Sequence, residues 1–314
     1  MKKPGVFLRA SIGIIILYLL IYKIDFNEVS KAISSLGIIV VFLFMLKYLF
    51  EKIMGAVNVK ILFNALGDKI SFLKLFMYSL VSYSLGLFSP GRIGEFSLIP
   101  MLKKENIEYG NSALVFLLDK FITILSLCLF SIYGFLLFLP INNALAIFIL
   151  LLLVIFASGF FLFSKSIRRL VKKHILGKYS NKFKGFSKSL DVLLKEKRGA
   201  LLANLALTFV QIIGGSFIFK IVFLHAGINM NIFIIAAISS AGRIISMIPI
   251  SLSGLGVRES ASVYFYSLLG VSSSIVGGTY LISLFVYYVI AGIFVLFLLQ
   301  VLFPKEYKNL KTIK

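Results

Sequence analysis

Long apolar segments separated by short polar loops make up most of this 314-residue chain. A helix needs about 20 mainly apolar residues to cross a bilayer. Segments close to that length or longer cover residues 6–22, 36–63, 112–138, 144–164, 200–224 and 275–303. We therefore predict an all-α, polytopic membrane protein with about six full transmembrane helices.

Two further apolar segments, 72–100 and 232–269, are interrupted by Pro, Gly and charged residues. The first interruption reads Ser-Pro-Gly-Arg-Ile-Gly-Glu over 89–95, and the second reads Ser-Gly-Leu-Gly-Val-Arg-Glu over 253–259. Unpaired backbone groups are costly in hydrocarbon, so broken helices at membrane depth survive only where protein or a water-filled cavity surrounds them. Each segment is therefore predicted to form a re-entrant helical hairpin.

The residues before the two interruptions match at a constant offset of 160 positions. The matching pairs are Gly55 and Gly215, Lys60 and Lys220, Phe63 and Phe223, and Gly67 and Gly227. The helix before the first hairpin is predicted to run inward and the helix before the second outward. Two similar units of opposite orientation are typical of inverted-repeat transporters.

Composition and charge agree with a membrane protein. Hydrophobic residues make up 60% of the chain and charged residues 14%, and the mean hydropathy is +1.01, which excludes an ordinary soluble domain. The formal net charge of +21 could suggest nucleic-acid binding, but the basic residues cluster in loops between the apolar segments. That pattern follows the positive-inside rule, so we expect membrane lipids rather than nucleic acid as partners.

The one long hydrophilic stretch, residues 165–198, carries twelve Lys and Arg residues against two acids. We expect it to form two basic amphipathic helices on the anionic cytoplasmic leaflet. It separates an N-terminal membrane half (1–164) from a C-terminal membrane half (199–314). If this stretch, the N-terminus and the basic tail from residue 305 are cytoplasmic, the first hairpin enters from the cytoplasm and the second from outside. The expected location is the cell membrane.

Each interruption combines glycines with an Arg and a Glu. They are Gly91, Arg92, Gly94 and Glu95 in the first, and Gly254, Gly256, Arg258 and Glu259 in the second. Glycines permit tight reversals, and helix N-termini after each break would present free N–H groups to a phosphate. Arginines add permanently charged, forked donors that also match phosphate. We predict that these residues, together with Arg243, bind the substrate.

Three roles for the Arg and Glu residues are open from the sequence. Glu95 and Glu259 are expected to neutralise the arginines that contact phosphate, because an unpaired charge at this depth is prohibitive. One Glu would instead couple transport to proton uptake. A third interpretation is that the Arg–Glu pairs only lock the hairpins together. The pairing of the two motifs predicts that both hairpins are needed and that their tips touch.

Other charged residues also lie within apolar segments. Lys47 and Glu51 are four residues apart, so they share a helix face and can neutralise each other. Asp119 and Lys120 are expected to form a local ion pair at the wet end of their helix.

Catalytic and metal-binding patterns are missing from the sequence. His174 and His225 fall in different loops, and Cys128 lies alone in an apolar run. No HExxH, GxSxG, P-loop or paired-carboxylate motif occurs. We therefore expect no enzyme activity, cofactor, metal site or disulfide.

The two interruptions resemble signature motifs of a flippase-like integral membrane family related to the transmembrane part of lysylphosphatidylglycerol synthases. Pro90-Gly91-Arg92-x-Gly94-Glu95 is similar to the first signature, and Ser253-Gly254-x-Gly256-Val257-Arg258-Glu259 to the second. The resemblance implies transbilayer movement of a lipid, such as an aminoacylated phospholipid or a polyprenyl-linked sugar. Members fused to a soluble synthase domain also make their lipid, which is not expected of this chain.

The leading hypothesis is thus a lipid flippase or scramblase-like transporter for a phosphate-bearing lipid. Two alternatives remain at this stage. One is a membrane scaffold that holds a separate lipid-modifying synthase or glycosyltransferase. The other is a proton-coupled carrier of small solutes.

Overall fold

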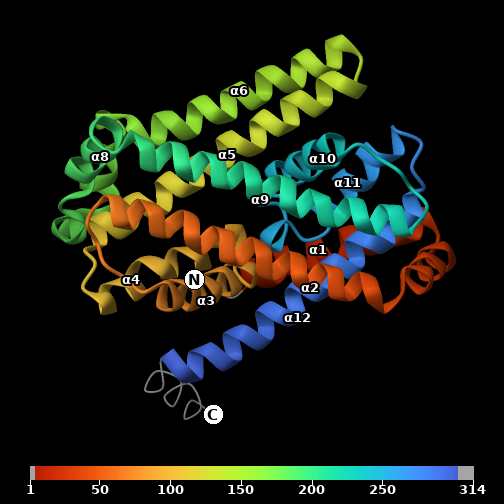
Figure 1. Ribbon diagram of the computed structural model, residues 1–314, viewed down its shortest axis with the longest axis horizontal. Coiled ribbons are helices and arrows are strands. Elements are labelled where there is room, and N and C mark those ends of the chain that lie inside the picture. Colours follow the sequence, from red (N-terminus) through yellow and green to blue (C-terminus); the bar gives the residue numbers. More distant parts are fainter. Residues whose placement is uncertain (1–3, 303–314) are drawn as a thin grey trace.

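Figure 1 shows a computed structural model that describes residues 4–302, in which every regular element is a helix. The α-helices are α1 (Pro4–Ile24), α2 (Phe26–Ala65), α3 (Phe72–Leu87), α4 (Leu98–Leu102), α5 (Tyr109–Phe138), α6 (Ile141–Phe163), α7 (Lys165–Leu170), α8 (Phe186–Lys195), α9 (Arg198–His225), α10 (Ile232–Ile245), α11 (Val257–Ser267) and α12 (Ser273–Leu302). The shorter or irregular helices are η1 (Pro90–Ser97), η2 (Lys103–Glu105), η3 (Val171–Leu176), η4 (Gly177–Phe183) and η5 (Leu252–Gly254). Residues 1–3 and 303–314, which include the predicted basic tail, lie outside the described residues.

Five helices within the described residues are long and apolar enough to cross a membrane. The spans they offer are Phe26–Ala65, Tyr109–Leu136, Ile141–Phe163, Arg198–His225 and Ser273–Phe294. The protein is therefore a multi-pass, all-helical membrane protein, as predicted. Helix α1 covers the segment expected as the first span but is not among these five, so the number of six stays a prediction.

Helix α2 begins ten residues before the predicted start of its apolar segment, at Phe26 instead of residue 36. The Asp25 carboxylate caps this early start by accepting a hydrogen bond from the Asn27 N–H at 2.8 Å. Gly37 then interrupts the helical backbone with a φ of 65°. The apolar pattern located the membrane-length part of α2, whereas a polar cap and a kink set its N-terminal extension.

Helices α2 and α9 pack against each other in antiparallel directions. As the residue number rises along α2, the number of its partner falls along α9. The contacts are Phe44 with Phe219 (ring centroids 5.2 Å apart), the Glu51 carbonyl with Gln211 (2.8 Å) and Asn58 with Thr208 (3.2 Å). Small residues at the crossing, Gly55 and Gly215, allow this close approach.

The ends of α2 and α9 repeat the same turn at the 160-residue offset found in the sequence. Gly67 and Gly227 both adopt left-handed backbone, with φ of 82° and 77°. After them, the N–H of Asp68 bonds to the Phe63 carbonyl at 3.0 Å, and that of Ile228 to the Phe223 carbonyl at 2.8 Å. Both are Schellman-type helix ends. The next helices, α3 and α10, then begin at equivalent positions, capped by Ser71 and Asn231.

Two hydrophobic cores hold the two interrupted segments. One core packs α3 and α4 against α2, α5 and α12, and the other packs α10 and α11 against α2, α9 and α12. Tyr48 of α2 belongs to the first core and Phe44 to the second, so α2 contributes to both. In Figure 1, α3 and α4 lie toward the left end of the molecule, and α10 and α11 toward the right.

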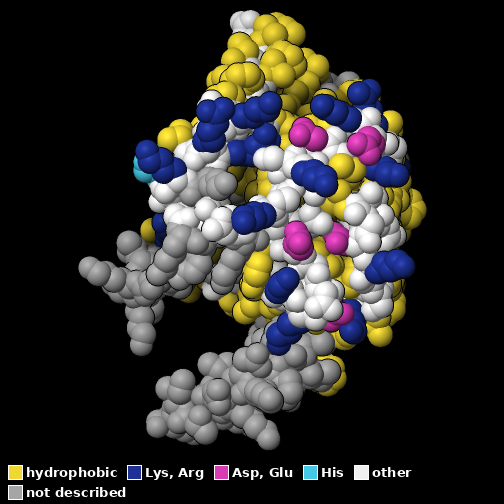
Figure 2. All heavy atoms as spheres, turned by 90° about the vertical axis from the view of Figure 1, so that its left-hand side faces the viewer, with side chains coloured by type: hydrophobic (Ala, Val, Ile, Leu, Met, Phe, Trp, Pro, Cys, Tyr) yellow, Lys and Arg dark blue, Asp and Glu magenta, His cyan; other side chains and the backbone are white. Residues whose placement is uncertain are grey.

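The basic stretch between the two membrane halves is helical over α7, η3, η4 and α8. Leu190 and Leu193 of α8 are 2% and 0% exposed, because they pack into a cluster with Leu114 and Leu118 of α5. The prediction that this apolar face lies on the lipid leaflet is therefore wrong for α8, whose apolar side is covered by the protein. Figure 2 shows Lys and Arg side chains gathered on this end of the molecule.

Candidate functional site

The first break follows α3, where two consecutive residues adopt left-handed backbone. Ser89 is extended, Pro90 starts η1, and Gly91 and Arg92 have φ of 59° and 56°. A left-handed conformation costs a residue with a Cβ roughly 1–2 kcal/mol, so the surrounding contacts must hold Arg92 in place. This geometry turns the chain back and directs the Arg92 side chain out of the tip.

The chain after the first tip lies directly against α3. A Cβ at Gly94 would come within 2.2 Å of the Leu85 carbonyl oxygen, so only glycine fits this approach. The Gly94 N–H donates to the Ser89 hydroxyl at 2.7 Å. Ser82 donates to the Glu95 carbonyl at 2.5 Å, and the Glu95 side chain is buried.

The second break lies between α10 and α11 and, like the first, contains two consecutive residues with left-handed backbone. Ser253 and Gly254 have φ of 51° and 79°, and Gly256 has a φ of 78°. A Cβ at Gly254 would lie 2.4 Å from that of Ser246, so this glycine permits close packing on the end of α10. Helix α1 covers this break, since Gly13 packs against Gly256.

The two breaks touch each other, as predicted. The Ser253 hydroxyl donates to the Gly86 carbonyl at 2.8 Å and lies 3.1 Å from the Ser89 carbonyl oxygen. Gly91 faces Pro249 of the second segment, where an added Cβ would be 3.9 Å from that of Pro249. Tips that are far apart in the sequence thus meet inside the helix bundle.

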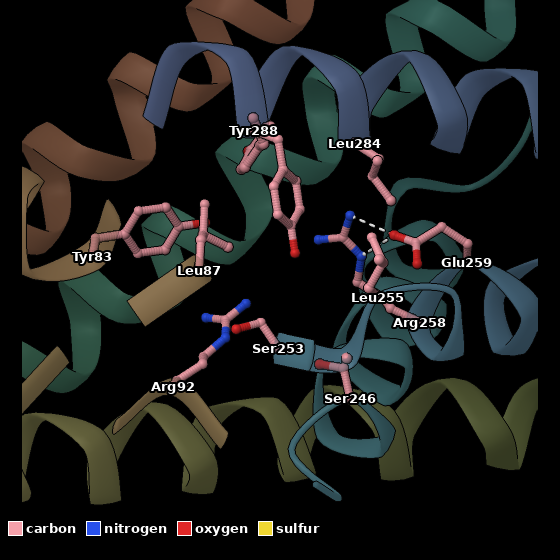
Figure 3. Close-up of a pocket in the computed structure, with 12 residues that line it drawn as sticks. Tyr83, Leu87, Arg92, Ser246, Ser253, Leu255, Arg258, Glu259, Leu284 and Tyr288 are labelled. Carbon is pink, nitrogen blue, oxygen red and sulfur yellow. Dashed lines mark hydrogen bonds and ion pairs between the residues drawn. The ribbon is translucent and has the colours of Figure 1, made fainter. Parts of the chain in front are cut away.

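A pocket opens at this junction and receives an arginine from each break (Figure 3). The guanidinium groups of Arg92 and Arg258 both point into it, and Ser253 lies near Arg92. Helix α12 supplies one wall. The full lining is Tyr83, Leu87, Arg92, Ser246, Ser253, Gly254, Leu255, Arg258, Glu259, Leu284, Tyr287 and Tyr288.

Each predicted Arg–Glu pair forms. Arg92 Nη1 lies 3.4 Å from Glu95 Oε1. Arg258 binds Glu259 Oε1 through Nε at 3.0 Å and Nη2 at 2.8 Å. The first pair is longer, and its Arg92 side chain is 38% exposed against 23% for Arg258. Arg92 is therefore the less tightly held of the two cations.

One N–H group at the start of α11 is occupied by a side chain of the same helix. The Gly256 N–H donates to Glu259 Oε2 at 2.9 Å, so the glutamate caps the N-terminus of its own helix. In the first break, the Gly94 N–H is likewise occupied by Ser89. Glu259 therefore orients Arg258 with one oxygen and accepts from the N–H of Gly256 with the other.

The expected local pair of Asp119 and Lys120 is also wrong. Lys120 Nζ binds Glu95 Oε2 at 2.6 Å, which joins α5 to the first break. Asp119 Oδ1 instead accepts a hydrogen bond from Asn204 of α9 at 3.2 Å. Neighbouring residues on a helix point about 100° apart, so each reaches a different partner.

Glu51 forms a second charged centre beside the pocket. Its Oε1 accepts from Lys47 Nζ at 2.6 Å, as predicted, and also from Arg243 of α10. Its Oε2 accepts from the Tyr287 hydroxyl at 2.7 Å, and Lys47 donates to the same hydroxyl at 2.9 Å. Arg243 thus joins the site through Glu51 and does not line the pocket itself.

Lys52 lies on the same helix but faces aromatic rings. Its Nζ is 2.9 Å from the centroid of Tyr83 and 5.4 Å from that of Tyr48. Arg92 lies 5.8 Å from the Tyr83 ring. Among the described residues, no carboxylate forms a salt bridge with Lys52.

We refer to the charged residues gathered around the two breaks as the central ionic cluster. Its members are Lys47, Glu51, Lys52, Arg92, Glu95, Asp119, Lys120, Arg243, Arg258 and Glu259. The sequence motifs identified the Arg–Glu pairs and Arg243 but missed the roles of Lys52, Asp119 and Lys120. Their signal is present, since each is a charged residue inside an apolar segment, where charge is costly and usually functional.

Metal ligands do not gather anywhere in the described part of the chain: no group of three or more His, Cys, Asp or Glu residues has suitable geometry. The cluster is instead rich in nitrogen donors, which suits an anionic ligand.

Comparison with known proteins gave one match. The family model described as the lysylphosphatidylglycerol synthase TM region matches residues 6–294. A search of curated proteins found none that matches this chain. The match spans both breaks and all five membrane-length helices.

Proposed function

The chain belongs to the family of the lysylphosphatidylglycerol synthase TM region, and on that premise we propose that it is a flippase- or scramblase-like transporter of a phosphate-bearing lipid. The lipid headgroup would occupy the pocket between the two breaks, while its tails stay in the bilayer. Binding of membrane lipids accords with the family and with the apolar surface of the helices.

The excess of positive charge at the pocket is the observation that carries this proposal. The central ionic cluster contains six basic side chains and four carboxylates, a formal excess of two positive charges. An uncompensated charge inside an apolar bundle is costly, and a bound anion would remove the cost.

An inverted repeat and two re-entrant hairpins form part of the proposal. The contacts at the α2–α9 crossing support the repeat, because Gly55 lies 3.9 Å from Gln211 and Gly215 lies 3.1 Å from Glu51, as measured from an added Cβ. At the 160-residue offset, Gly55 corresponds to Gly215 and Glu51 to Gln211, so the two contacts are equivalent. Such reciprocal contacts are expected of two units related by a two-fold axis, and they support the proposed repeat.

The hairpins follow from helix lengths at the breaks. Helices α3 and α10 have 16 and 14 residues, fewer than the number needed to cross a bilayer. Each ends at the central junction, and the helix after the break leads away again. We propose that the first hairpin enters from the cytoplasm and the second from outside, with the protein in the cell membrane and both termini cytoplasmic.

A transport role, with no catalysis by this chain, completes the proposal. The cluster would recognise the headgroup through charge, and the two halves would alternate access to it, as in other inverted-repeat carriers. Of the charged residues that line the pocket, Arg258 binds Glu259 and Arg92 binds Glu95, and no His is among the described lining residues.

The test is a translocation assay with the purified chain in lipid vesicles. A fluorescent anionic phospholipid should cross faster than in protein-free vesicles. The Arg92→Ala/Arg258→Ala double variant should lose at least about tenfold of this rate, because it removes both cations that face the pocket. A matched control is Arg169→Ala/Lys188→Ala, which removes two cations from the exposed surface of α7 and α8.

Two results would contradict the proposal. Equal rates for the wild type and the double variant would show that the pocket does not handle the headgroup. No translocation by the wild type, combined with co-purification of a lipid-modifying enzyme, would favour the scaffold function instead.

A further inference from the structure

The counter-charges of the central ionic cluster are unevenly distributed between the two breaks. On the side of the second break, Arg258 binds Glu259 Oε1 through two of its nitrogens, and Lys47 and Arg243 share Glu51. Every cation on this side therefore has a carboxylate in direct contact.

The side of the first break is different. Lys120 binds Glu95 at 2.6 Å, which leaves Arg92 at 3.4 Å from the same carboxylate. Lys52 has only the Tyr83 and Tyr48 rings as partners among the described residues. A cation–π contact is weaker than a salt bridge to a desolvated carboxylate, so Lys52 is the cation whose charge is least compensated.

Tyr83 brings Lys52 and Arg92 to the same place. Its ring contacts Lys52 Nζ and the Arg92 guanidinium, at 2.9 and 5.8 Å from the centroid, and also lines the pocket. Lys52 and Arg92 are both basic, so their side chains repel each other at this ring unless an anion binds between them. Lys52 and Arg92 are therefore arranged as an anion subsite, next to the part of the pocket that Arg258 lines.

The size of the charge excess indicates the charge of the ligand. A lipid phosphodiester carries one negative charge, whereas a phosphate monoester carries about two at neutral pH and a diphosphate diester also carries two. Only the second kind of headgroup would cancel both excess charges of the cluster. In an apolar bundle, the ligand that leaves no net charge behind binds best.

We infer that the transported lipid carries two negative charges on its phosphate groups, as a phosphate monoester or a diphosphate diester does, and that Lys52, Arg92 and Lys120 form the subsite for the second charge. The inference rests on the proposed transport function and adds the substrate class. It also makes Lys52, which does not line the pocket in its present position, a specificity-determining residue.

The experiment compares two lipids that have the same acyl tails. Phosphatidic acid supplies a phosphate monoester and phosphatidylglycerol a phosphodiester. Each is added to vesicles that contain the wild-type protein and a labelled phosphatidic acid tracer, and the concentration that halves tracer translocation is measured. Phosphatidic acid should compete at a concentration at least about tenfold lower than phosphatidylglycerol, because the monoanion leaves one charge uncompensated.

Variants at Lys52 test the assigned subsite. Lys52→Gln reduces the excess to one positive charge, so the preference for phosphatidic acid should be lost and should reverse in favour of phosphatidylglycerol. Lys52→Arg keeps the charge and should keep the preference, which separates charge from packing. Lys60→Gln is the matched control, since Lys60 lies on the same helix beside Phe72, outside the cluster, and should not change the preference.

The outcomes separate this inference from the proposed function. Suppose that both lipids compete equally while Arg92→Ala/Arg258→Ala still abolishes transport. The inferred preference for a doubly charged headgroup would then be overturned, and the proposed transport function would be retained. If no lipid is moved by the wild type, both fall. Inorganic diphosphate should compete poorly because it lacks a tail; competition as strong as that of phosphatidic acid would overturn the assignment to a lipid and indicate a free anion.

Discussion

At the scale of single residues, the Glu51 carboxylate has the largest number of side-chain partners in the cluster. Its carboxylate contacts Lys47, Arg243 and the Tyr287 hydroxyl, and its side chain is only 6% exposed. Two cations thus depend on one buried anion. Removing the shared carboxylate of Glu51 should therefore cost much more stability than removing one of the two cations that it binds.

We predict that Glu51→Gln lowers the free energy of unfolding by about 3 kcal/mol or more, because it leaves Lys47 and Arg243 without a counter-charge. Lys47→Met should cost less than half as much, since Glu51 keeps Arg243 and Tyr287. Denaturation of both purified variants in the same detergent measures the difference. Equal losses would show that Glu51 is not the shared partner.

Residue spacing predicted some of these contacts and not others. The Lys47–Glu51 and Arg92–Glu95 pairs are four and three residues apart, so their spacing brings the groups together. Arg258 and Glu259 are adjacent, and the motif rather than helical spacing predicted their pair. The contacts of Arg243 with Glu51 and of Lys120 with Glu95 join different helices. Helix packing decides such contacts, and the apolar pattern of one chain does not specify it.

At the scale of elements, each break depends on glycines that let backbone segments touch. Gly94 is the tightest case, because the Leu85 carbonyl oxygen occupies the space of its missing Cβ. The sequence indicated that glycines would permit a tight reversal. It did not reveal that the returning chain lies against the last turn of α3.

We predict that Gly94→Ala lowers the free energy of unfolding by about 2 kcal/mol and reduces transport, because the methyl group displaces the first tip from Ser253. Gly199→Ala is the matched control. Gly199 lies in the first turn of α9 with nothing within 4 Å of an added Cβ, so its substitution should change stability little. Unchanged stability and transport in Gly94→Ala would contradict the packing of the first tip.

A contact between α3 and η2, outside the membrane spans, should make the stability of the fold depend on pH. Glu105 of η2 accepts hydrogen bonds from Lys74 at 2.8 Å and from Tyr78 at 2.9 Å, and the Lys74 hydrogen bond in particular lowers the pKa of the carboxyl below its ordinary range. A lowered pKa stabilises the fold above the unfolded-state value, and the stabilisation is lost as pH falls through the folded-state value.

We predict that the Glu105→Gln variant and the wild type differ in unfolding free energy by about 1 kcal/mol at pH 7. The difference should shrink as the pH falls below about 4.3, where the unfolded carboxyl becomes protonated. Thermal unfolding from pH 7 to pH 3 measures it. A difference that grows on acidification would contradict the assigned direction.

At the scale of the whole molecule, the apolar pattern was sufficient to predict a helical, multi-pass protein with two interrupted segments. The 160-residue offset also located the corresponding helix ends, since the turns at Gly67 and Gly227 form the same hydrogen bonds. The position of α8 was not predictable, because its Leu190 and Leu193 face suits lipid and protein equally well. Only the three-dimensional packing of α5 beside it decides which one covers it.

The formal excess of two positive charges in the proposed site would also have an electrical consequence. A dianionic headgroup would make the loaded site neutral, whereas the empty site would remain at +2. Moving one elementary charge across 100 mV changes the free energy by about 2.3 kcal/mol, so the return of the empty site would respond to the membrane potential and the loaded step would not. A membrane that is negative inside would then hold the unloaded site toward the cytoplasm, where it is ready to take up its next lipid.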